Sequence, residues 1–173
     1  MNGVTLRPAT GADEPFLREL FRSTLEPLLR AMPLDERGRE VVCDMQFRAQ
    51  AASYRNAFAQ AEYLVVCDAG ARPIGRLTRA WDGDALVLVD IALVPEVRGR
   101  GIGTSLVRAM QQEARSRGAA VLLNVEGSNP ALRLYRRMGF GCVGDDGMRL
   151  RMRWLPVETL EEEGEGWIRT SER

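Results

Sequence analysis

Residues 94–107, "VPEVRGRGIGTSLV", carry the strongest structural signal in the chain. An apolar run, "ALVLVDIALV" at 85–94, leads into this stretch, and an amphipathic run follows it. Between the two, glycine occupies every second position, at Gly99, Gly101 and Gly103. Glycine has no Cβ to obstruct a ligand, and the first amides of a helix point outward from its N-terminus. We therefore predict a strand, a turn and a helix whose main-chain amides bind an anion.

Two familiar nucleotide-binding loops fit this turn poorly. A Walker-type loop requires Gly-Lys-Ser/Thr, and the chain contains no lysine, which excludes that loop. The dinucleotide fingerprint Gly-x-Gly-x-x-Gly would need a third glycine where this chain has Thr104 or Leu106. A tight turn that only packs a strand against a helix stays open as the structural alternative.

The basic residues narrow the possible chemistry. All 24 are arginine and histidine is absent, so mechanisms that depend on lysine or histidine are excluded. The net charge is zero, but residues 98–153 hold eleven arginines against four acids. Such a local excess attracts a phosphorylated small molecule as well as it attracts nucleic acid. Aromatic residues are not interleaved with the arginines, so we expect no nucleic-acid partner.

Length and composition predict one domain. A chain of 173 residues with 45% hydrophobic residues can bury one substantial core, which we place in residues 1–155. Residues 156–173 hold six glutamates and two glycines, typical of a mobile acidic tail. Three widely spaced cysteines suit reduced thiols in a core, and they favour neither a disulfide framework nor a metal site. No apolar run is long enough for a membrane span or a signal peptide, so we expect a cytoplasmic protein.

Periodicity and turn residues predict alternating strands and helices. The expected elements, in order, are a strand ending at Pro8, a helix from residue 13 to near Pro33, a helix at 36–60, strands at 63–68, 73–81 and 85–94, a helix at 102–117, a strand at 120–125, a helix at 129–138 and two strands within 139–154. The nearly continuous apolar run at 85–94 predicts a central strand that is covered on both faces. The expected apolar faces are Phe16, Leu20, Leu25 and Leu28 on the first helix and Val41, Val42, Met45, Ala49 and Ala52 on the second.

Two motifs resemble one known family. The stretch Arg98-Gly-Arg-Gly-Ile-Gly103, preceded by Val-Pro-Glu, looks like the coenzyme A pyrophosphate loop of the GNAT superfamily of acyl-CoA-dependent N-acyltransferases. Downstream, "NPALRLYRRMGF" at 129–140 resembles the second signature of that family, Asn-x-x-Ala-x-x-Leu-Tyr-x-x-x-Gly-Phe. Asn129 lies two residues before the alanine, and Ser128 stands where the family has its asparagine. Either of these two residues is a candidate contact for the cofactor.

The resemblance implies a fold class and a cofactor. The fold would be mixed α/β, with a central, mostly antiparallel sheet, one splayed parallel pair of strands and flanking helices. The separated strands would pair with the pantetheine arm of acetyl-CoA, and the glycine turn would bind its pyrophosphate. The resemblance places these residues at the cofactor: Ile91, Ala92, Leu93, Arg98, Gly99, Arg100, Gly101, Ile102, Gly103, Thr104, Asn129 and Tyr135.

The same resemblance implies catalytic roles. The amine would attack the acetyl thioester directly, through a tetrahedral intermediate whose oxyanion the Leu93 amide stabilises. Tyr135 matches the acid that protonates the departing thiolate, and its structural alternative is packing within the buried stripe of its helix. Asp90 and Glu126 are the candidate bases. An ion pair with an arginine is the structural alternative for Asp90, and a solvated strand end is the alternative for Glu126.

These observations predict an acetyl-CoA-dependent N-acetyltransferase that acts on a primary amine. A non-catalytic acyl-CoA-binding protein that regulates a partner is the alternative. In the family the segment between the first two strands walls the acceptor site, here the helices within 11–60. The acceptor could be a small molecule or a peptide amine, and two copies could pair through the last strands or the tail. No metal and no membrane partner is expected.

Overall fold

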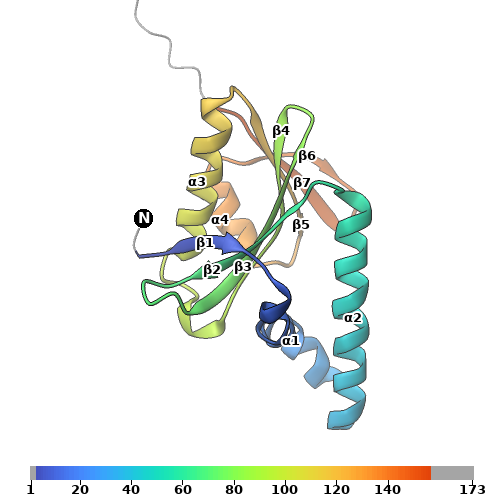
Figure 1. Ribbon diagram of the computed structural model, residues 1–173. Helices are drawn as coiled ribbons and strands as arrows, with labels where there is room; N and C mark the ends of the chain where they lie inside the picture. The colour runs from blue at the N-terminus through green and yellow to red at the C-terminus, as the bar shows by residue number, and fades with distance from the viewer. Residues whose placement is uncertain (1–2, 157–173) are drawn as a thin grey trace, which may run out of the picture.

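The computed structural model of the chain describes residues 3–156, and the predicted acidic tail lies outside them. Seven strands form one sheet in the order β1-β2-β3-β4-β5-β7-β6 (Figure 1). The strands are β1 (Thr5–Pro8), β2 (Glu62–Cys67), β3 (Pro73–Asp82), β4 (Ala85–Leu93), β5 (Ala120–Glu126), β6 (Gly141–Asp145) and β7 (Arg149–Trp154). The helices are α1 (Glu14–Ala31), α2 (Glu36–Ala57), α3 (Ile102–Ser116) and α4 (Ala131–Arg137), with short 3-10 turns at Gly11–Asp13 and Pro95–Val97. The mixed α/β class is confirmed.

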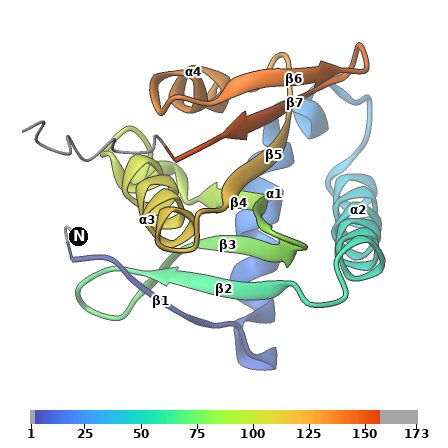
Figure 2. The same cartoon turned by 90° about the horizontal axis from the view of Figure 1, so that it is seen from above.

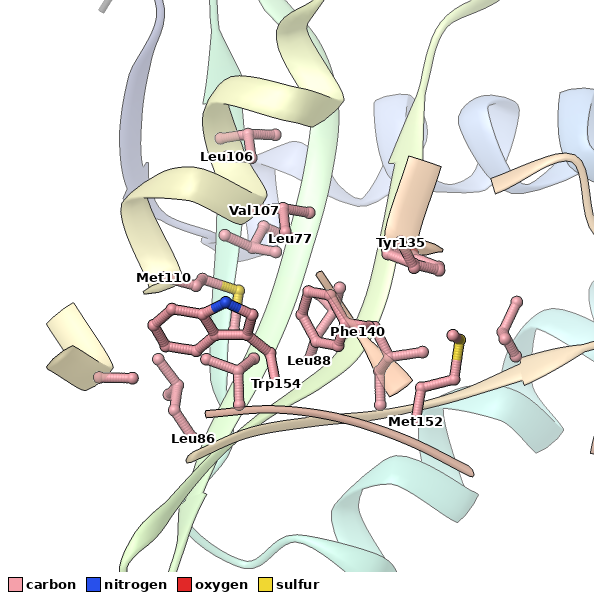
Figure 3. Close-up of a cluster of buried hydrophobic side chains, with 14 of the residues drawn as sticks. Leu77, Leu86, Leu88, Leu106, Val107, Met110, Tyr135, Phe140, Met152 and Trp154 are labelled. Carbon is pink, nitrogen blue, oxygen red and sulfur yellow. The ribbon is translucent and has the colours of Figure 1, made fainter. Parts of the chain in front are cut away.

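The helices lie in two layers about the sheet (Figure 2). Helices α3 and α4 pack on one face, and α1 packs on the other with α2 against it. The main core lies between the sheet and the α3–α4 layer, where Leu86, Met110 and Trp154 pack together (Figure 3). In α3 the predicted spacing is confirmed, because Leu106, Met110 and Ala114 are all buried, and Gly118 (φ +63°) follows the end of the helix. The apolar face of α3 therefore holds it on the strands that carry the glycine turn.

The second helix presents a different face to the protein from the one that periodicity predicts. Val41 is 62% exposed and Met45 58% exposed, whereas Cys43 is buried and Phe47 is half-buried. On α1, the predicted core residue Leu28 is likewise 53% exposed. On the first helix the prediction was wrong for Leu28 only, because Leu20 is buried and Leu25 packs against the buried Phe21 and Leu29. On the second helix Val42 also packs there, but Val41, Met45, Ala49 and Ala52 are exposed, so most of that prediction was wrong. Helical period alone does not identify which stripe is buried.

The strand β4 is central, as predicted, and every neighbouring pair in the sheet is antiparallel except β4 and β5. Parallel pairing joins residues 85–88 only to residues 120–123. Residues 90–93 of β4 and 124–126 of β5 are not paired with each other, and we call these two segments the splay. A β-bulge lies where the splay begins, because Thr78 pairs with Asp90 while Arg79 pairs with Leu88, which leaves Val89 as an extra residue. Bulges twist and bend a strand, which accounts for β4 leaving β5 at this point.

The cysteines are free, and two of them are buried in accordance with the prediction: Cys43 and Cys67. Cys142 is exposed on β6, at an edge of the sheet, so the prediction of a core position is wrong for this residue. Within residues 3–156 no three potential ligands among Cys, Asp and Glu come together as a metal site. No helix of this described range is long and apolar enough to cross a membrane.

Candidate active site

The glycine turn adopts the conformation that its sequence demands. Gly99 (φ +73°) and Gly101 (φ +81°) lie in the left-handed region, where a side chain costs roughly 1–2 kcal/mol. Gly101 directly precedes α3, and its carbonyl accepts the first helical hydrogen bond, from the Ser105 amide at 3.0 Å. The two positive φ angles thus turn the chain from the end of β4 into the helix.

The N-terminus of α3 has no side-chain cap. The amides of Ile102, Gly103 and Thr104 precede the first helical donor, so they have no partner within the helix. Such amides, together with the helix dipole, make a helix N-terminus favourable for an anion. A 15-residue helix that begins directly after a glycine turn can bind a phosphate group there.

The two arginines of the turn differ in their surroundings. Arg98 donates from Nε to the Leu93 carbonyl oxygen at 2.8 Å and from Nη2 to Ser23 Oγ at 3.3 Å. Its side chain therefore joins the turn to the end of β4 and to α1. Arg100 is exposed, and no hydrogen bond of its side chain occurs within the described residues.

Main-chain groups of β4 face the splay at alternate residues. The Val94 amide donates to the Ile74 carbonyl at 2.9 Å, and hydrogen-bonded pairs alternate with non-bonded pairs along an antiparallel ladder. The main-chain groups of Ala92 therefore face β3, and those of Ile91 and Leu93 face away from β3, toward the splay. Because Arg98 binds the Leu93 carbonyl, the groups that remain facing the splay are the Leu93 amide and the amide and carbonyl of Ile91.

Tyr135 reaches the same region from α4. Only 5% of this residue is exposed, and its ring packs edge-on against Phe140 at 5.8 Å between centroids. Burial, and secondarily the negative charge of Asp90, raise the pKa of the Tyr135 phenol to about 12. The phenol therefore keeps its proton throughout the neutral and moderately alkaline range, which is the state that a proton donor needs.

Asp90 forms the ion pair that was its structural alternative. Its Oδ2 accepts from Arg76 Nε at 2.5 Å, and the two side chains are only 18% and 11% exposed. Arg76 also donates from Nη2 to Gln50 Oε1 at 2.8 Å, which ties β3 to α2. Asp90 thus stabilises an arginine that would otherwise lie partly buried without a counter-ion.

Tyr54 is a second buried phenol at this place, and sequence reasoning gave it no role. It comes from α2 on the face opposite Tyr135, and burial together with the charge of Asp90 raises its pKa to about 12, although Arg76 and Arg149 act in the lowering direction. Its only sequence signal was its position among the aromatic residues of the segment 11–60. Gln50, one helical turn before Tyr54, was also missed, because its contact with Arg76 is visible only in the structure.

The remaining predicted residues follow the second strand of the splay. Glu126 is exposed at the end of β5, and it pairs in register with Arg149 of β7. Asn129 Oδ1 accepts from the Ala131 amide at 2.9 Å, so this side chain binds the first amide of α4. Ser128, the other candidate, is exposed.

Two cavities border these groups. One of about 290 Å³ lies between the first two helices and the strands β2 and β3, and its lining includes Glu14, Phe47, Tyr54, Tyr63 and Arg76. The other, of about 560 Å³, lies beside the β5–α4 loop and is lined by residues 127–130 and by arginines of α4. The first cavity adjoins the Arg76–Asp90 ion pair, and the second adjoins the start of α4.

Comparison with known proteins gives the relationship of the chain. Residues 22–140 match the acetyltransferase (GNAT) family. The chain is 46% identical over 69 residues to streptothricin acetyltransferase of Streptomyces lavendulae and 37% identical over 76 residues to an acetyltransferase of Agrobacterium fabrum. These matches cover 39% and 43% of this chain but only 36% and 51% of the two relatives. The chain therefore matches about a third to a half of the length of these relatives.

Solved structures share the fold. The PaiA N-acetyltransferase of Thermoplasma acidophilum, solved with coenzyme A, superposes with a TM-score of 0.66 at 18% identity over 88% of this chain and 99% of its own. Spermidine N-acetyltransferase of Vibrio cholerae, solved with CoA and spermine, gives a TM-score of 0.61 at 20% identity over 90% and 96% of the two chains. The family match spans most of the chain and includes the glycine turn, the splay and α4. The chain belongs to the acetyltransferase (GNAT) family.

Proposed function

We propose that this protein transfers an acetyl group from acetyl-CoA to a primary amine. One observation carries the proposal: β4 separates from β5 directly before a glycine turn and an uncapped helix N-terminus. A linear, amide-rich arm that ends in a pyrophosphate requires both features, free main-chain groups along its length and convergent amides at its end. Residues 1–155 would act as one N-acetyltransferase domain.

The chain's own groups fit such a cofactor. The amides at the start of α3, with the residues of the turn, would hold the pyrophosphate, and Arg100 would add positive charge. The main-chain groups of Ile91 would pair with the pantetheine arm, the Leu93 amide would face the thioester carbonyl, and Ala92 would contribute through its side chain. Asn129 would act by fixing the start of α4, because its side-chain oxygen binds an amide of its own helix.

Acetyl-CoA supplies a thioester whose carbonyl carbon accepts the amine nitrogen as the bond to sulfur breaks. The Leu93 amide would donate to the carbonyl oxygen as negative charge develops on it. Tyr135 would donate its proton to the departing sulfur, because the phenol is neutral and lies in the buried region beside the splay.

The amine must lose a proton, and Glu126 is the better placed acceptor. It lies at the exposed end of the splay, and no ion pair of its carboxylate occurs within residues 3–156. The Oδ2 of Asp90 is engaged by Arg76, so Asp90 would act as a positioning residue that holds Arg76 and Gln50 in place. The helices within 11–60 would wall the acceptor site, and the 290 Å³ cavity that they line lies beside this ion pair.

The test combines calorimetry with CoA and an assay of thiol release from acetyl-CoA over a panel of amines. Gly101→Ala places a Cβ at a φ of +81° in the turn, so CoA affinity should fall at least tenfold, about the value of one charge-assisted hydrogen bond. Gly83→Ala is the matched control, because Gly83 (φ +60°) also has open space around it but lies in the remote β3–β4 turn.

Equal CoA affinities for the two variants would contradict the proposed cofactor site. If CoA binds but no amine increases thiol release, the protein is a non-catalytic acyl-CoA-binding protein. Glu126→Gln should lower kcat and remove the ascending limb of the pH–rate profile, whereas Asp90→Asn should chiefly raise the KM for the amine.

A further inference from the structure

Three arginines form a row on one face of β7. Arg149, Arg151 and Arg153 alternate with Leu150, Met152 and Trp154, which face the main core. The arginines therefore face the opposite side of the sheet, on which α1 and α2 lie, and all three are exposed. We call these residues the β7 arginines. Alternate residues of a strand lie about 6.5–7 Å apart, so one small anion can contact two of them.

The row borders the splay. In the register of β5 and β7, Arg149 lies beside Glu126 and Arg151 lies beside Asn124. These two positions of β5 belong to the splay, whereas Arg153 lies beside Leu122, where β5 is still paired with β4. On the side of α2, Arg149 is close enough to Tyr54 for its charge to oppose the rise in the pKa of that phenol. Arg149 and Arg151 therefore lie at the acceptor side of the proposed reaction centre.

The charges of this face are not balanced. Within the described residues no carboxylate forms an ion pair with a β7 arginine, although other arginines of the chain, such as Arg76 and Arg79, do have such partners. Asp146, the acid nearest along the chain, accepts instead from the Met148 and Arg149 amides in its own turn. Around the splay, Arg76 of β3 and the β7 arginines share this face with Asp90 of β4 and Glu126 of β5, so the arginines there outnumber the carboxylates.

The acids of the helical segment do not offset this excess. Asp44 pairs with Arg18, Glu36 pairs with Arg22, and Glu26 pairs with Arg30. Asp35 accepts from the Gly38 amide as the cap of α2. Most of the carboxylates that would attract a polycationic acceptor are therefore already bound within the protein.

We propose that the acceptor is an amine that also bears an anionic group, a carboxylate or a phosphate, which Arg151 and Arg149 bind while the amine lies at the splay. The inference rests on the proposed function, since it names the class of its second substrate. A guanidinium binds either anion through two parallel hydrogen bonds, and this orients the rest of the molecule. Arg151 is thus a specificity-determining residue, and its contacts are made with the part of the acceptor that does not react.

The test compares acceptors that differ only in charge. The panel contains dipeptides with a free or an amidated C-terminus, an amino sugar with and without a phosphate, and spermidine. For the wild type we expect kcat/KM to be at least tenfold higher for the anionic member of a pair. The peptide pair and the sugar pair distinguish a carboxylate from a phosphate as the bound group.

Variants locate the effect. Arg151→Gln should lower kcat/KM about tenfold, mainly through KM, for the acceptor that bears the anionic group. The member of the pair without that group should change little. Arg151→Glu should reduce kcat/KM for the acceptor with the anionic group about a hundredfold and should improve the use of spermidine. Arg108→Gln is the control, because Arg108 is an exposed arginine of α3, outside β7 and the splay, and it should leave both values unchanged.

The outcomes separate the two proposals. If neutral amines and spermidine react as fast as the anionic acceptors, or if Arg151→Gln affects both members of a pair equally, the inference is wrong while the acetyltransferase function stands. If no amine of the panel increases thiol release, both the proposed function and this inference are overturned.

Discussion

Residues 85–154 and residues 14–57 are stabilised by different forces. The first region contributes most of one continuous apolar core, in which Leu86, Val121 and Met110 are at most 1% exposed. The second has four buried apolar residues, Leu20 and the small cluster of Phe21, Leu29 and Cys43. Ion pairs between arginines and acids, such as Arg18–Asp44 and Arg22–Glu36, also join its two helices, and their side chains are partly exposed.

The difference corresponds to the two substrates that we propose. On these proposals main-chain geometry would hold the cofactor, and it requires a rigid frame, which the close-packed core of residues 85–154 supplies. The acceptor would meet side chains on α2 and β7, whose identities can change without disturbing that frame. The frame would then carry the family motifs, and the helices beside it would determine which amine enters.

The largest effect should come from the core. Leu123→Ala, at a residue that is 2% exposed, should lower the free energy of unfolding by about 3–5 kcal/mol. Leu29→Ala, at an equally buried residue of the small cluster, should cost about 2 kcal/mol because its half-buried neighbours can close the space. Urea unfolding of both variants measures the difference. Equal losses would show that the two regions share one core.

The two buried phenols allow a matched test of function. Tyr135→Phe should lower kcat about a hundredfold with little change in CoA affinity, because it removes only the proposed proton donor. Tyr54→Phe, whose phenol is shifted to the same pKa, should change kcat less than threefold and act mainly on the KM for the amine. Similar losses of kcat would remove the distinction between a cofactor side and an acceptor side.

Alkaline pH should weaken the fold through the same two residues. Their pKa values of about 12 lie above the value near 10 of a phenol in the unfolded chain. The stabilisation is complete below about pH 10 and is lost as the pH rises toward 12, by roughly 1 kcal/mol per pH unit for each phenol. Urea midpoints measured across this range should show a smaller slope in Tyr135→Phe. An unchanged slope would mean that Tyr135 is solvated.

Salt should have the smallest effect, confined to the first two helices. Sodium chloride at 1 M screens exposed ion pairs, so amide exchange in α1 and α2 should rise about two- to fivefold while that of β4 and β5 stays constant. Hydrogen exchange measured at low and high salt reports both regions in one experiment. Uniform exchange across the molecule would contradict a difference in the forces that hold them.

The sequence predicted residues 85–154 well because two independent signals agree on the type of element there. In α3, apolar spacing agrees with a glycine at each end, and in β4 an unbroken apolar run agrees with its place in the middle of the sheet. The succession of strands and helices along the chain and the glycine turn both followed from such local signals. The parallel pair and its splay came from the family resemblance, since neither periodicity nor turn chemistry indicates where two strands part.

The acceptor side was predicted poorly for a physical reason. The inner face of α2 carries Gln50 and Tyr54, polar residues that lie against Arg76 and Asp90 on the same side of the sheet. Val41 and Met45 have the same helical spacing and are more apolar, so hydropathy selects the wrong stripe. Only the three-dimensional contacts of α2 reveal that polar contacts with Arg76 and Asp90 decide which residues face inward.

The extra residue Val89 changes which face of the sheet the even-numbered and odd-numbered side chains of β4 occupy. Before it, the even-numbered Leu86 and Leu88 belong to the main core, and after it the odd-numbered Ile91 and Leu93 pack there. If the same residues formed a regular strand, the alternation would carry Asp90 into an apolar interior and turn Ile91 and Leu93 outward. Deleting Val89 would instead make β4 regular while Asp90, Ile91 and Leu93 kept their present faces, so the bend of the strand would be lost and the Arg76–Asp90 ion pair would remain.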